Sequence, residues 1–332
     1  MKVLIIQTAF IGDVILATPV IAELHRCYPT AEIHVVVRKG NESLLNNFPG
    51  ISKVISWDKS NGKTVNLFKT LSMIRAEKYD QVFNLQRFFS TGILTAFSGA
   101  NKKTGFDKNP LSFLFSTKVR HEIGSEKQIH ETSRNLLLIA GSGANTNVRP
   151  QLFPSMVDFE TVARYKISPY VCIAPTSVWF TKQVPATKWV ELIQSIRQSG
   201  FPDNIYLLGG PSDKEDCEKL IQASGDAGII NLAGKLSFLQ TAALMKDAQM
   251  NYVNDSAPMH IASAMNAPVT AFYCSTVPSF GFGPLSDESY VEEVSHLDCR
   301  PCGLHGYKAC PKQHFKCAMN LNMSLTATHL HS

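Results

Sequence analysis

The sequence has no run of 18 uninterrupted apolar residues, so we expect no membrane-spanning helix. It also lacks a G-x-G-x-x-G fingerprint and a G-x-x-x-x-G-K-S/T motif, which weakens the case for NAD or P-loop ATP chemistry. Motifs of DNA and RNA readers, short-period repeats and low-complexity segments are missing as well. The N-terminal apolar run starts with a single Lys and is broken by Gly12, Asp13 and Pro19, so we expect no export signal.

What the sequence does have is the composition of an ordinary globular protein. Its 332 residues exceed the usual size of one core and predict two domains. Residues 1–165 carry 20 Lys and Arg against 13 Asp and Glu, a net +7, whereas residues 166–332 carry a net −2. A basic first half favours an anionic partner, such as acidic lipid or a phosphorylated substrate, more than nucleic acid. A surface with surplus solvated Lys is the alternative explanation.

Strand-like and helix-like segments alternate along the whole chain. This alternation predicts an α/β fold of parallel sheets covered by helices. We place the domain boundary in the Gly-, Asn- and Pro-rich stretch 141–153, giving domains 1–150 and 151–332. The expected strands are 3–6, 33–37, 54–56, 81–85, 103–106, 170–174, 205–208, 228–231, 250–254 and 269–273. The expected helices are 14–25, 42–46, 65–78, 89–97, 129–140, 186–198, 213–223, 237–246 and 259–265.

The start of the chain places one carboxylate where a ligand would bind. Residues 2–6 form a continuous apolar run, typical of a strand buried on both faces. The run is broken at residues 7–12, and Asp13 opens the helix that follows. Asp13 therefore lies just beyond the carboxyl end of the first strand, where open α/β sheets bind their ligands.

The stretch N-Y-V-N-D-S-A-P-M-H-I-A-S at 251–263 joins a buried strand to a helix. Pro258 fits the first turn of that helix, and Asp255 or Ser256 is well placed as its N-cap. The free N–H groups and positive dipole end of such a helix attract anions, phosphate above all. His260 is near enough to contact the same ligand. A capped helix with a packed histidine explains the stretch equally well, so both interpretations stay open here.

Two further strand ends carry candidate ligand-binding residues. Thr176 and Ser177 follow a predicted strand and precede Lys182, a loop that would suit a diphosphate with the lysine as countercharge. A solvated loop lysine is the simpler interpretation. In L-L-G-G-P-S-D, Asp213 follows a Gly-Gly turn, where it would bind the hydroxyls of a ribose or serve as a plain N-cap.

Four of the eight cysteines form a cluster near the end of the chain. Cys299, Cys302, Cys310 and Cys317 have the spacing C-x2-C-x7-C-x6-C, with two histidines between them. Four thiolates suffice for a closed tetrahedral zinc site, which would be structural rather than catalytic. The later spacings are irregular for zinc, so cysteines without metal are the alternative. The other four are expected to be small buried apolar residues.

Taken in order, these segments resemble glycosyltransferase family 9, the heptosyltransferases of lipopolysaccharide core assembly. The resemblance covers about residues 1–320 and is more specific as an ordered set than in any one part. It is carried by K-V-L-I-I-Q-T-A-F-I-G-D-V at the start, K-Y-D-Q-V-F-N-L-Q at 78–86, T-K-Q-V-P-A-T-K-W at 181–189, L-G-G-P-S-D at 208–213 and N-D-S-A-P-M-H-I-A-S-A at 254–264.

The resemblance implies a GT-B fold, with two Rossmann-like domains that face each other across a central cleft. It implies that the C-terminal domain binds ADP-L-glycero-D-manno-heptose and that the N-terminal domain binds the acceptor, Kdo or a prior heptose of the inner core. Transfer would invert the anomeric centre without a metal, and no cofactor is required. The enzyme would lie at the cytoplasmic face of the inner membrane, held by electrostatics and its anionic glycolipid acceptor, with no nucleic-acid partner.

The resemblance also assigns the catalytic roles. Asp13 matches the base that takes the proton from the acceptor hydroxyl. Lys182 matches the lysine that stabilises the departing diphosphate, and backbone N–H groups after Asp255 and Ser256 would share that charge.

Other matched positions concern the donor nucleotide. Thr176 and Ser177 would add hydroxyl donors, and His260 matches the family's histidine at the phosphates. Asp213 stands where members carry a ribose-binding Glu, which has the longer side chain. Ala257 stands where the family usually has Gly, and an alanine would be strained there if the position needs a positive φ.

Three other interpretations remain. The first keeps the fold and replaces the donor by another nucleotide sugar. The second is a degenerate, non-catalytic nucleotide-sugar-binding module, which would have no use for a base at Asp13. The third is an interaction protein built on the cysteine cluster, which would need bound zinc to fold.

Overall fold

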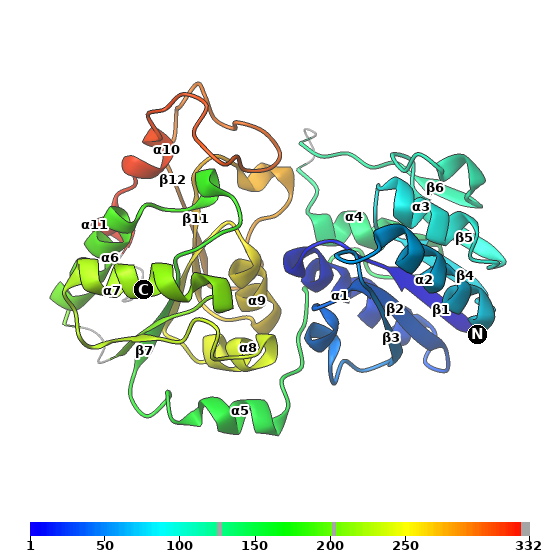
Figure 1. The fold of residues 1–332 in the computed structure, drawn as a ribbon, viewed down its shortest axis with the longest axis horizontal. Coiled ribbons are helices and arrows are strands. Elements are labelled where there is room, and N and C mark those ends of the chain that lie inside the picture. The colour runs from blue at the N-terminus through cyan, green and yellow to red at the C-terminus, as the bar shows by residue number, and fades with distance from the viewer. Residues whose placement is uncertain (125–127, 201–203, 327–332) are drawn as a thin grey trace. The chain divides into compact units, whose positions relative to one another are not determined.

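The computed structural model describes residues 1–124, 128–200 and 204–326. The chain forms two compact units, Met1–Phe153 (unit 1) and Pro154–Ser332 (unit 2), shown in Figure 1. We placed the boundary after residue 150, whereas the structure divides after Phe153. The ring of Phe153 packs edge-on against Phe48 with 4.9 Å between centroids, and Asn47 donates a hydrogen bond to its carbonyl. These contacts hold residue 153 on unit 1.

Unit 1 is built on a parallel sheet with the strand order β3-β2-β1-β4-β5-β6. The central strand β1 pairs with β2 on one side and β4 on the other. Val3, Leu4, Ile5 and Ile6 are all fully buried, as expected for a strand covered on both faces. The strands are β1 (Lys2–Ile6), β2 (Glu32–Arg38), β3 (Ile51–Trp57), β4 (Gln81–Asn84), β5 (Lys102–Phe106) and β6 (Thr117–Val119).

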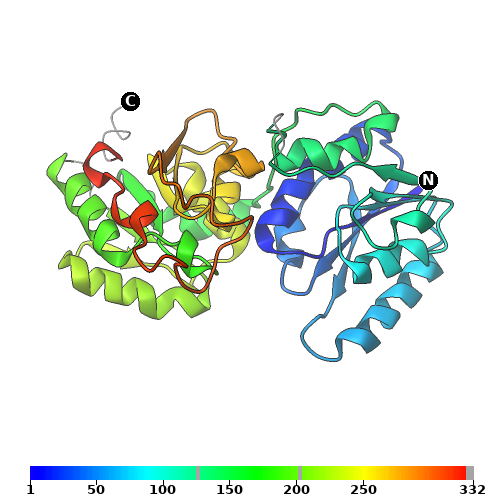
Figure 2. The same cartoon turned by 90° about the horizontal axis from the view of Figure 1, so that it is seen from above.

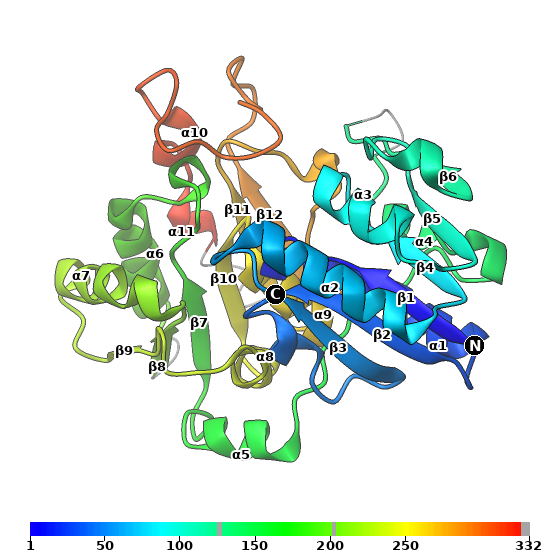
Figure 3. The same ribbon diagram turned by 45° about the vertical axis from the view of Figure 1, so that its right-hand side comes forward.

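The helices of unit 1 cover both faces of this sheet. Helix α1 (Ile11–Cys27) contacts α4 (Glu131–Leu137), whereas α2 (Lys63–Glu77) contacts α3 (Phe89–Ala96). The connection from β1 to β2 runs in one direction along the sheet and those from β3 to β4 and from β4 to β5 run in the other. Right-handed crossovers therefore place the two helix pairs on opposite faces, as Figure 3 shows for α1 and α2.

Unit 2 repeats the design with a second parallel sheet, in the order β12-β11-β10-β7-β8-β9. Strands β7, β10 and β11 are buried along their whole length and form the centre of the sheet. The strands are β7 (Tyr170–Ala174), β8 (Asn204–Leu207), β9 (Ile229–Asn231), β10 (Met250–Asn254), β11 (Val269–Tyr273) and β12 (Ser289–Glu293).

The core of unit 2 includes the C-terminal segment. Trp189 packs edge-on against Phe272, and Cys317, Leu321 and Met323 join the same buried cluster. Figure 2 shows this orange-to-red segment folding back onto the unit. The helices are α5 (Met156–Ala163), α6 (Ala186–Gln198), α7 (Lys214–Ser224), α8 (Phe238–Lys246), α9 (Ala257–Met265), α10 (Lys316–Met319) and α11 (Met323–Thr326).

The structure confirms the predicted α/β fold as two Rossmann-like units, and a strand lies at each of the ten expected strands. Strands β6 and β12, at the sheet edges, and helices α5, α10 and α11 were not predicted. The expected helix at 42–46 is a 3-10 turn, Glu42–Leu45, and the one at 129–140 is shorter, since α4 ends at Leu137. Within the described ranges, none of the helices has both the length and the apolar character needed to span a bilayer.

Candidate functional site

The start of α9 in unit 2 has the features of an anion site. Strand β10 ends at Asn254, and Ser256 occupies the N-cap position with an extended backbone. In the described structure the Ser256 side chain makes no capping bond to the helix; its hydroxyl lies 3.4 Å from the Asn254 carbonyl instead. Pro258 is in the first turn, as expected. The Met259 N–H donates to the Ser256 carbonyl at 3.1 Å and Pro258 has no N–H, so in the described structure the N–H groups of Ser256 and Ala257 are the ones left for a ligand at this end of α9.

Asp255 is not the N-cap of α9; its carboxylate instead forms an ion pair with Lys182 at the start of this helix. The Lys182 Nζ lies 2.6 Å from Asp255 Oδ2, and the two side chains are only 17% and 7% exposed. Thr276 Oγ1 donates to the same carboxylate oxygen at 2.6 Å. The lysine predicted to contact the diphosphate and the aspartate predicted at the start of α9 thus form one ion pair, with the lysine ammonium at the positive end of a helix.

Asn254 fixes the loop that carries Lys182, a role the sequence did not reveal. Its Oδ1 accepts a 2.9 Å hydrogen bond from the N–H of Val184, and its Nδ2 donates to the carbonyl of Pro175 at 2.9 Å. Asn254 is fully buried, so these bonds are shielded from water. The two ends of loop 175–184 are therefore tied to the last residue of β10. A buried amide at a strand end is the signal that would have found it.

The segment that contains the clustered cysteines clamps the same loop from another side. Thr181 Oγ1 accepts bonds from the N–H of Tyr307 (2.8 Å) and the hydroxyl of Ser275 (3.1 Å), and the Thr181 N–H donates to the Tyr307 carbonyl. A Cβ on Gly306 would lie 2.4 Å from Trp179 Cβ and 2.9 Å from Lys182 Cγ. Only glycine allows this close approach, so the segment shapes the lysine loop directly.

The cysteines themselves do not form the zinc site that their spacing suggested. Among the residues described, no group of three or more His, Cys, Asp or Glu side chains could hold an ion. The thiols are used in other ways: Cys317 is buried in the core, the Cys302 thiol donates to the Cys299 carbonyl, and Cys299 Sγ is 4.0 Å from His314 Nε2. Burial raises the pKa of Cys310, but N–H groups of residues 312–315 lower that pKa by more.

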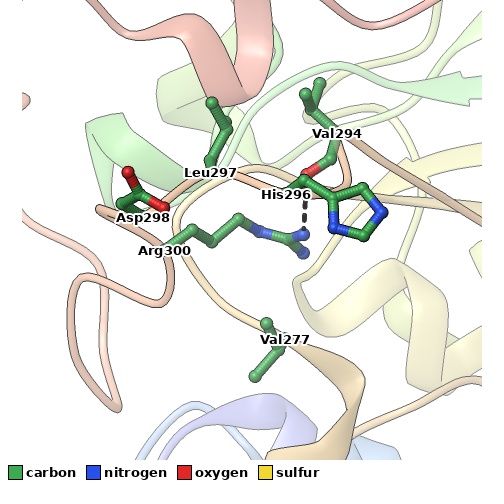
Figure 4. A pocket seen from close by; sticks show the side chains of 6 residues that line it. All are labelled: Val277, Val294, His296, Leu297, Asp298 and Arg300. Carbon is green, nitrogen blue, oxygen red and sulfur yellow. Dashed lines mark hydrogen bonds between the residues drawn. The ribbon is translucent and has the colours of Figure 1, made fainter.

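Arg300, shown in Figure 4 among the residues that line a small pocket, is hydrogen-bonded to the backbone of Thr276. Its guanidinium donates from Nε and Nη2 to the carbonyl of Thr276, at 3.1 and 2.7 Å, and from Nη1 to the Val294 carbonyl, drawn as a dashed line. A small pocket opens beside this arginine, lined by Val277, His296, Leu297 and Asp298 as well. Because Thr276 in turn binds Asp255, the arginine is linked to the ion pair through one threonine.

The remaining candidates of unit 2 lie along the same edge of the sheet. Thr176 and Ser177 follow β7, Asp213 follows β8 and Thr276 follows β11, each at a carboxyl end. The Asp213 carboxylate accepts a 2.7 Å bond from the N–H of Gly210 and so closes its own turn. Strand β8, which Asp213 follows, is separated from β10 by one strand, β7.

Two positions of α9 complete the comparison with the sequence. His260 is the fourth residue of the helix and is 6% exposed. Ala257 is the first residue of the helix and is not among the residues with positive φ. The strain considered for an alanine at that position is therefore absent.

In unit 1, Asp13 lies in the first turn of α1, beyond the carboxyl end of β1, as predicted. The N–H of Phe10 donates to Asp13 Oδ2 at 3.2 Å, so the carboxylate caps its own helix and leaves its other oxygen outside this bond. The carboxylate is partly exposed.

The chain is similar to known proteins over nearly its whole length. A protein called lipopolysaccharide heptosyltransferase 3 of Escherichia coli is 28% identical over 284 residues, covering 80% of this chain and 82% of that protein. The solved structure of E. coli ADP-heptose lps heptosyltransferase II matches with a TM-score of 0.78 at 22% identity, covering 100% and 99% of the two chains. That of E. coli heptosyltransferase WaaC with ADP matches with a TM-score of 0.69 at 20% identity, covering 88% and 92%.

The family model described as glycosyltransferase family 9 (heptosyltransferase) matches residues 67–310, more than half of the chain. This span includes the Lys182 loop, Asp213, the start of α9 and the segment that clamps the loop. The two Rossmann-like units and the residues at the edge of the second sheet agree with the match. The chain belongs to glycosyltransferase family 9, the heptosyltransferase family, and is a glycosyltransferase.

Proposed function

We propose that this glycosyltransferase moves heptose from ADP-L-glycero-D-manno-heptose onto the inner core of lipopolysaccharide. The observation that carries the proposal is the Lys182–Asp255 pair at the start of α9, on the carboxyl edge of the unit 2 sheet. A diphosphate bound there would meet one ammonium group and the N–H groups of Ser256 and Ala257 at the positive end of a helix. The relatives named for heptosyl transfer, and the one solved with ADP, support this donor.

In the proposed reaction Asp13 is the base. Its carboxylate takes the proton of the acceptor hydroxyl while that oxygen forms a bond to the anomeric carbon of the heptose. The bond from this carbon to the diphosphate breaks, ADP leaves with the electron pair, and the configuration inverts. Lys182 and the start of α9 stabilise the charge on the departing diphosphate, so the step as proposed uses no metal ion.

The other donor contacts follow from the strand ends. We place the ribose near Asp213, and the phosphates near His260 and the hydroxyls of Thr176 and Ser177. Because Asp213 already accepts one bond from Gly210, its second oxygen is the one offered to a ribose hydroxyl. The acceptor is placed on unit 1, whose basic character suits an anionic glycolipid. We propose that the enzyme works at the cytoplasmic face of the inner membrane as a peripheral protein.

The donor is tested by thermal melting with ADP, UDP, GDP and ADP-heptose. A ligand at 100 times its Kd stabilises the folded state by about 2.7 kcal/mol. We expect a shift with ADP and ADP-heptose only. A shift with UDP or GDP instead would replace the donor, and no shift with any of the four would contradict the proposed donor.

The base is tested by Asp13→Asn, which keeps an oxygen to accept from the Phe10 N–H but removes the basic carboxylate. We expect transfer to fall by about 10²- to 10⁴-fold, with the ADP melting shift unchanged. Transfer at the wild-type rate in this variant would remove Asp13 from the mechanism.

A further inference from the structure

A group of polar side chains in unit 1 lies where the sheet changes direction. The strand order β3-β2-β1-β4-β5-β6 has its switch point between β1 and β4, because the chain leaves these two strands toward opposite edges. In open α/β sheets, the crevice outside the carboxyl ends of the strands at this point is the usual ligand site. Gln7 follows β1 there, and Gln86 and Arg87 follow β4.

Gln7 and Gln86 are almost completely buried, at 2% and 6% exposure, yet their hydrogen bonding is incomplete. Gln86 Nε2 donates to Gln7 Oε1, whereas Gln86 Oε1 is shielded from water and accepts no bond from any described residue. The Nδ2 of Asn84, two residues earlier, is likewise buried without an acceptor. Gln86 Oε1 is thus an unused acceptor and Asn84 Nδ2 an unused donor, and a sugar hydroxyl, which both donates and accepts, can bind either kind of atom.

The segment that carries Gln86 is held rigidly. Asn109, itself 2% exposed, donates from Nδ2 to the carbonyls of Gln86 (3.1 Å) and Phe88 (3.0 Å). The N–H of Gln86 donates to Asn84 Oδ1 at 2.9 Å. The backbone of Gln86 is held by these bonds and its side chain by the bond to Gln7 before any ligand arrives, which lowers the entropy cost of binding.

Arg87 adds a cation to this group. It is partly exposed, and within the described part of the chain no carboxylate pairs with it. A guanidinium without a partner beside buried amides suits a carboxylate or a phosphate, which it binds with two parallel hydrogen bonds. Phe88, next to it, is 59% exposed and offers an apolar surface.

We propose that Gln86 and Arg87, supported by Gln7, form the acceptor subsite of unit 1, and that its ligand is a sugar with an anionic group. The sugar hydroxyls bind the unused amide atoms and the anionic group binds Arg87. The inference rests on the proposed glycosyl transfer, for which Asp13, in the helix that follows β1, supplies the base. It adds the residues that select and hold the acceptor.

The test measures the KM for a deacylated Kdo–lipid A acceptor in Arg87→Ala and Gln86→Leu, with ADP-heptose as donor. We expect each change to raise the acceptor KM by about 10- to 100-fold, because each leaves polar groups of the acceptor unpaired. The donor KM and the ADP melting shift should not change. Arg75→Ala, on the exposed side of α2, and Gln81→Leu, at the other end of β4, are the matched controls and should leave the acceptor KM unchanged.

Two acceptor analogues identify the anionic group. If Arg87 binds a phosphate, a dephosphorylated acceptor abolishes the difference between wild type and Arg87→Ala; if it binds the carboxylate, an acceptor with that group converted to an amide does so. A wild-type acceptor KM in both Arg87→Ala and Gln86→Leu would overturn the subsite. Because Gln86 is buried, the melting temperature of its variant is compared with wild type, and Arg87→Ala provides the test at a less buried position.

Failure of the proposed function gives a different result. If the wild-type protein transfers no heptose to this acceptor, the reaction is wrong, and binding of the acceptor alone, measured by calorimetry, still tests the subsite. Acceptor binding that weakens about 10-fold or more in Arg87→Ala supports the subsite without any turnover. Binding that is equal in wild type and variant overturns it.

Discussion

Asp255 serves two neighbours with one carboxylate oxygen, since Lys182 Nζ and Thr276 Oγ1 both lie 2.6 Å from Oδ2. A bound diphosphate would contact the Lys182 ammonium group, whose charge Asp255 neutralises when no donor is bound. The aspartate therefore keeps the lysine in place before the donor arrives, at some cost in affinity once the donor is bound. The sequence indicated Lys182 as a diphosphate contact and Asp255 as a residue at the start of α9 but not their pairing, because the pair depends on how two strand ends meet.

This pairing predicts strong coupling between the two residues. Lys182→Ala leaves a carboxylate that is 7% exposed without its cation, so we expect a loss of about 2–4 kcal/mol in the free energy of unfolding. The double variant Lys182→Ala/Asp255→Ala should lose less than the sum of the two single variants. Urea unfolding of the four proteins measures this coupling. Lys219→Ala, which breaks an exposed pair with Glu215, is the control and should change stability by under about 0.5 kcal/mol. Additive single losses would show that the pair is not formed.

His121 predicts a dependence of stability on acid. Burial, together with the nearby charges of Arg87, Arg134 and Lys108 and against an opposing effect of Asp107, lowers its pKa to about 4. Between pH 6.5 and pH 4 the unfolded chain binds a proton at this residue that the folded chain does not bind. The free energy of unfolding therefore falls as the pH drops through this window, by about 1.4 kcal/mol per pH unit from this residue.

His121→Phe should remove that contribution while keeping a ring against Phe106, on which His121 now packs edge-on at 4.5 Å. Urea unfolding of both proteins at pH 7 and pH 5 measures the difference. Wild type should lose more stability than the variant on acidification. Equal losses would contradict the buried, neutral state of this histidine.

Among the elements, the loop at 175–184 shows how a short irregular segment is fixed from outside itself. Asn254 ties its two ends to β10, and Tyr307 with Gly306 packs on its middle. Its own sequence specifies little beyond the 3-10 turn Phe180–Lys182. The loop could therefore be located from the sequence as a candidate, but its shape could not, because the residues that determine it lie in other parts of the chain.

A single methyl group at residue 306 should disturb the donor site. Gly306→Ala places a Cβ within 3 Å of Trp179 and Lys182, so these side chains must move. We expect a weaker ADP melting shift and, for the repacking, a loss of about 1–3 kcal/mol in stability. Gly283→Ala is the control, because its Cβ would meet only Pro278 at an ordinary 3.8 Å. An ADP shift equal to that of wild type would show that the clamp does not shape the lysine loop.

The two strands that the sequence missed share a physical reason. Strands β6 (T-K-V) and β12 (S-Y-V-E-E) lie at sheet edges, where one side faces away from the sheet and polar residues are tolerated. Neither has the apolar run by which β1 or β10 was recognised. The expected helix at 42–46 is too short for its pattern to separate an α-helix from the 3-10 turn that forms. Central strands were predictable because burial on both faces leaves a strong signal in the sequence.

At the scale of the whole molecule, each unit has its own sheet, and charge is divided unevenly along the chain. Residues 1–165 carry a net +7, and residues 166–332 carry a net −2. An acceptor with phosphate or carboxylate groups is therefore attracted mainly by the first half. The sequence predicted this division fully, since charge can be counted without a fold, but it did not show where the unpaired cation Arg87 lies.

The charge division predicts that acceptor use depends on salt. Raising NaCl from about 50 to about 300 mM shortens the range of electrostatic attraction, so the KM for the anionic acceptor should rise several-fold. Steady-state kinetics at fixed, saturating ADP-heptose measure this rise. An acceptor stripped of its phosphates should show a smaller rise. A flat acceptor KM across this range would mean that the basic surface plays no part in capture.

The contact between Thr181 and Tyr307 joins residues that are made at different times. The N–H that closes the clamp belongs to a residue 126 positions later in the chain. At the usual 5–20 residues per second of synthesis, this gap lasts roughly 6–25 seconds, during which the lysine loop exists on the ribosome without its partner. Unit 1 is complete in sequence well before then. The nascent enzyme therefore gains its nucleotide-binding shape last, and ADP can assist only the final stage of its folding.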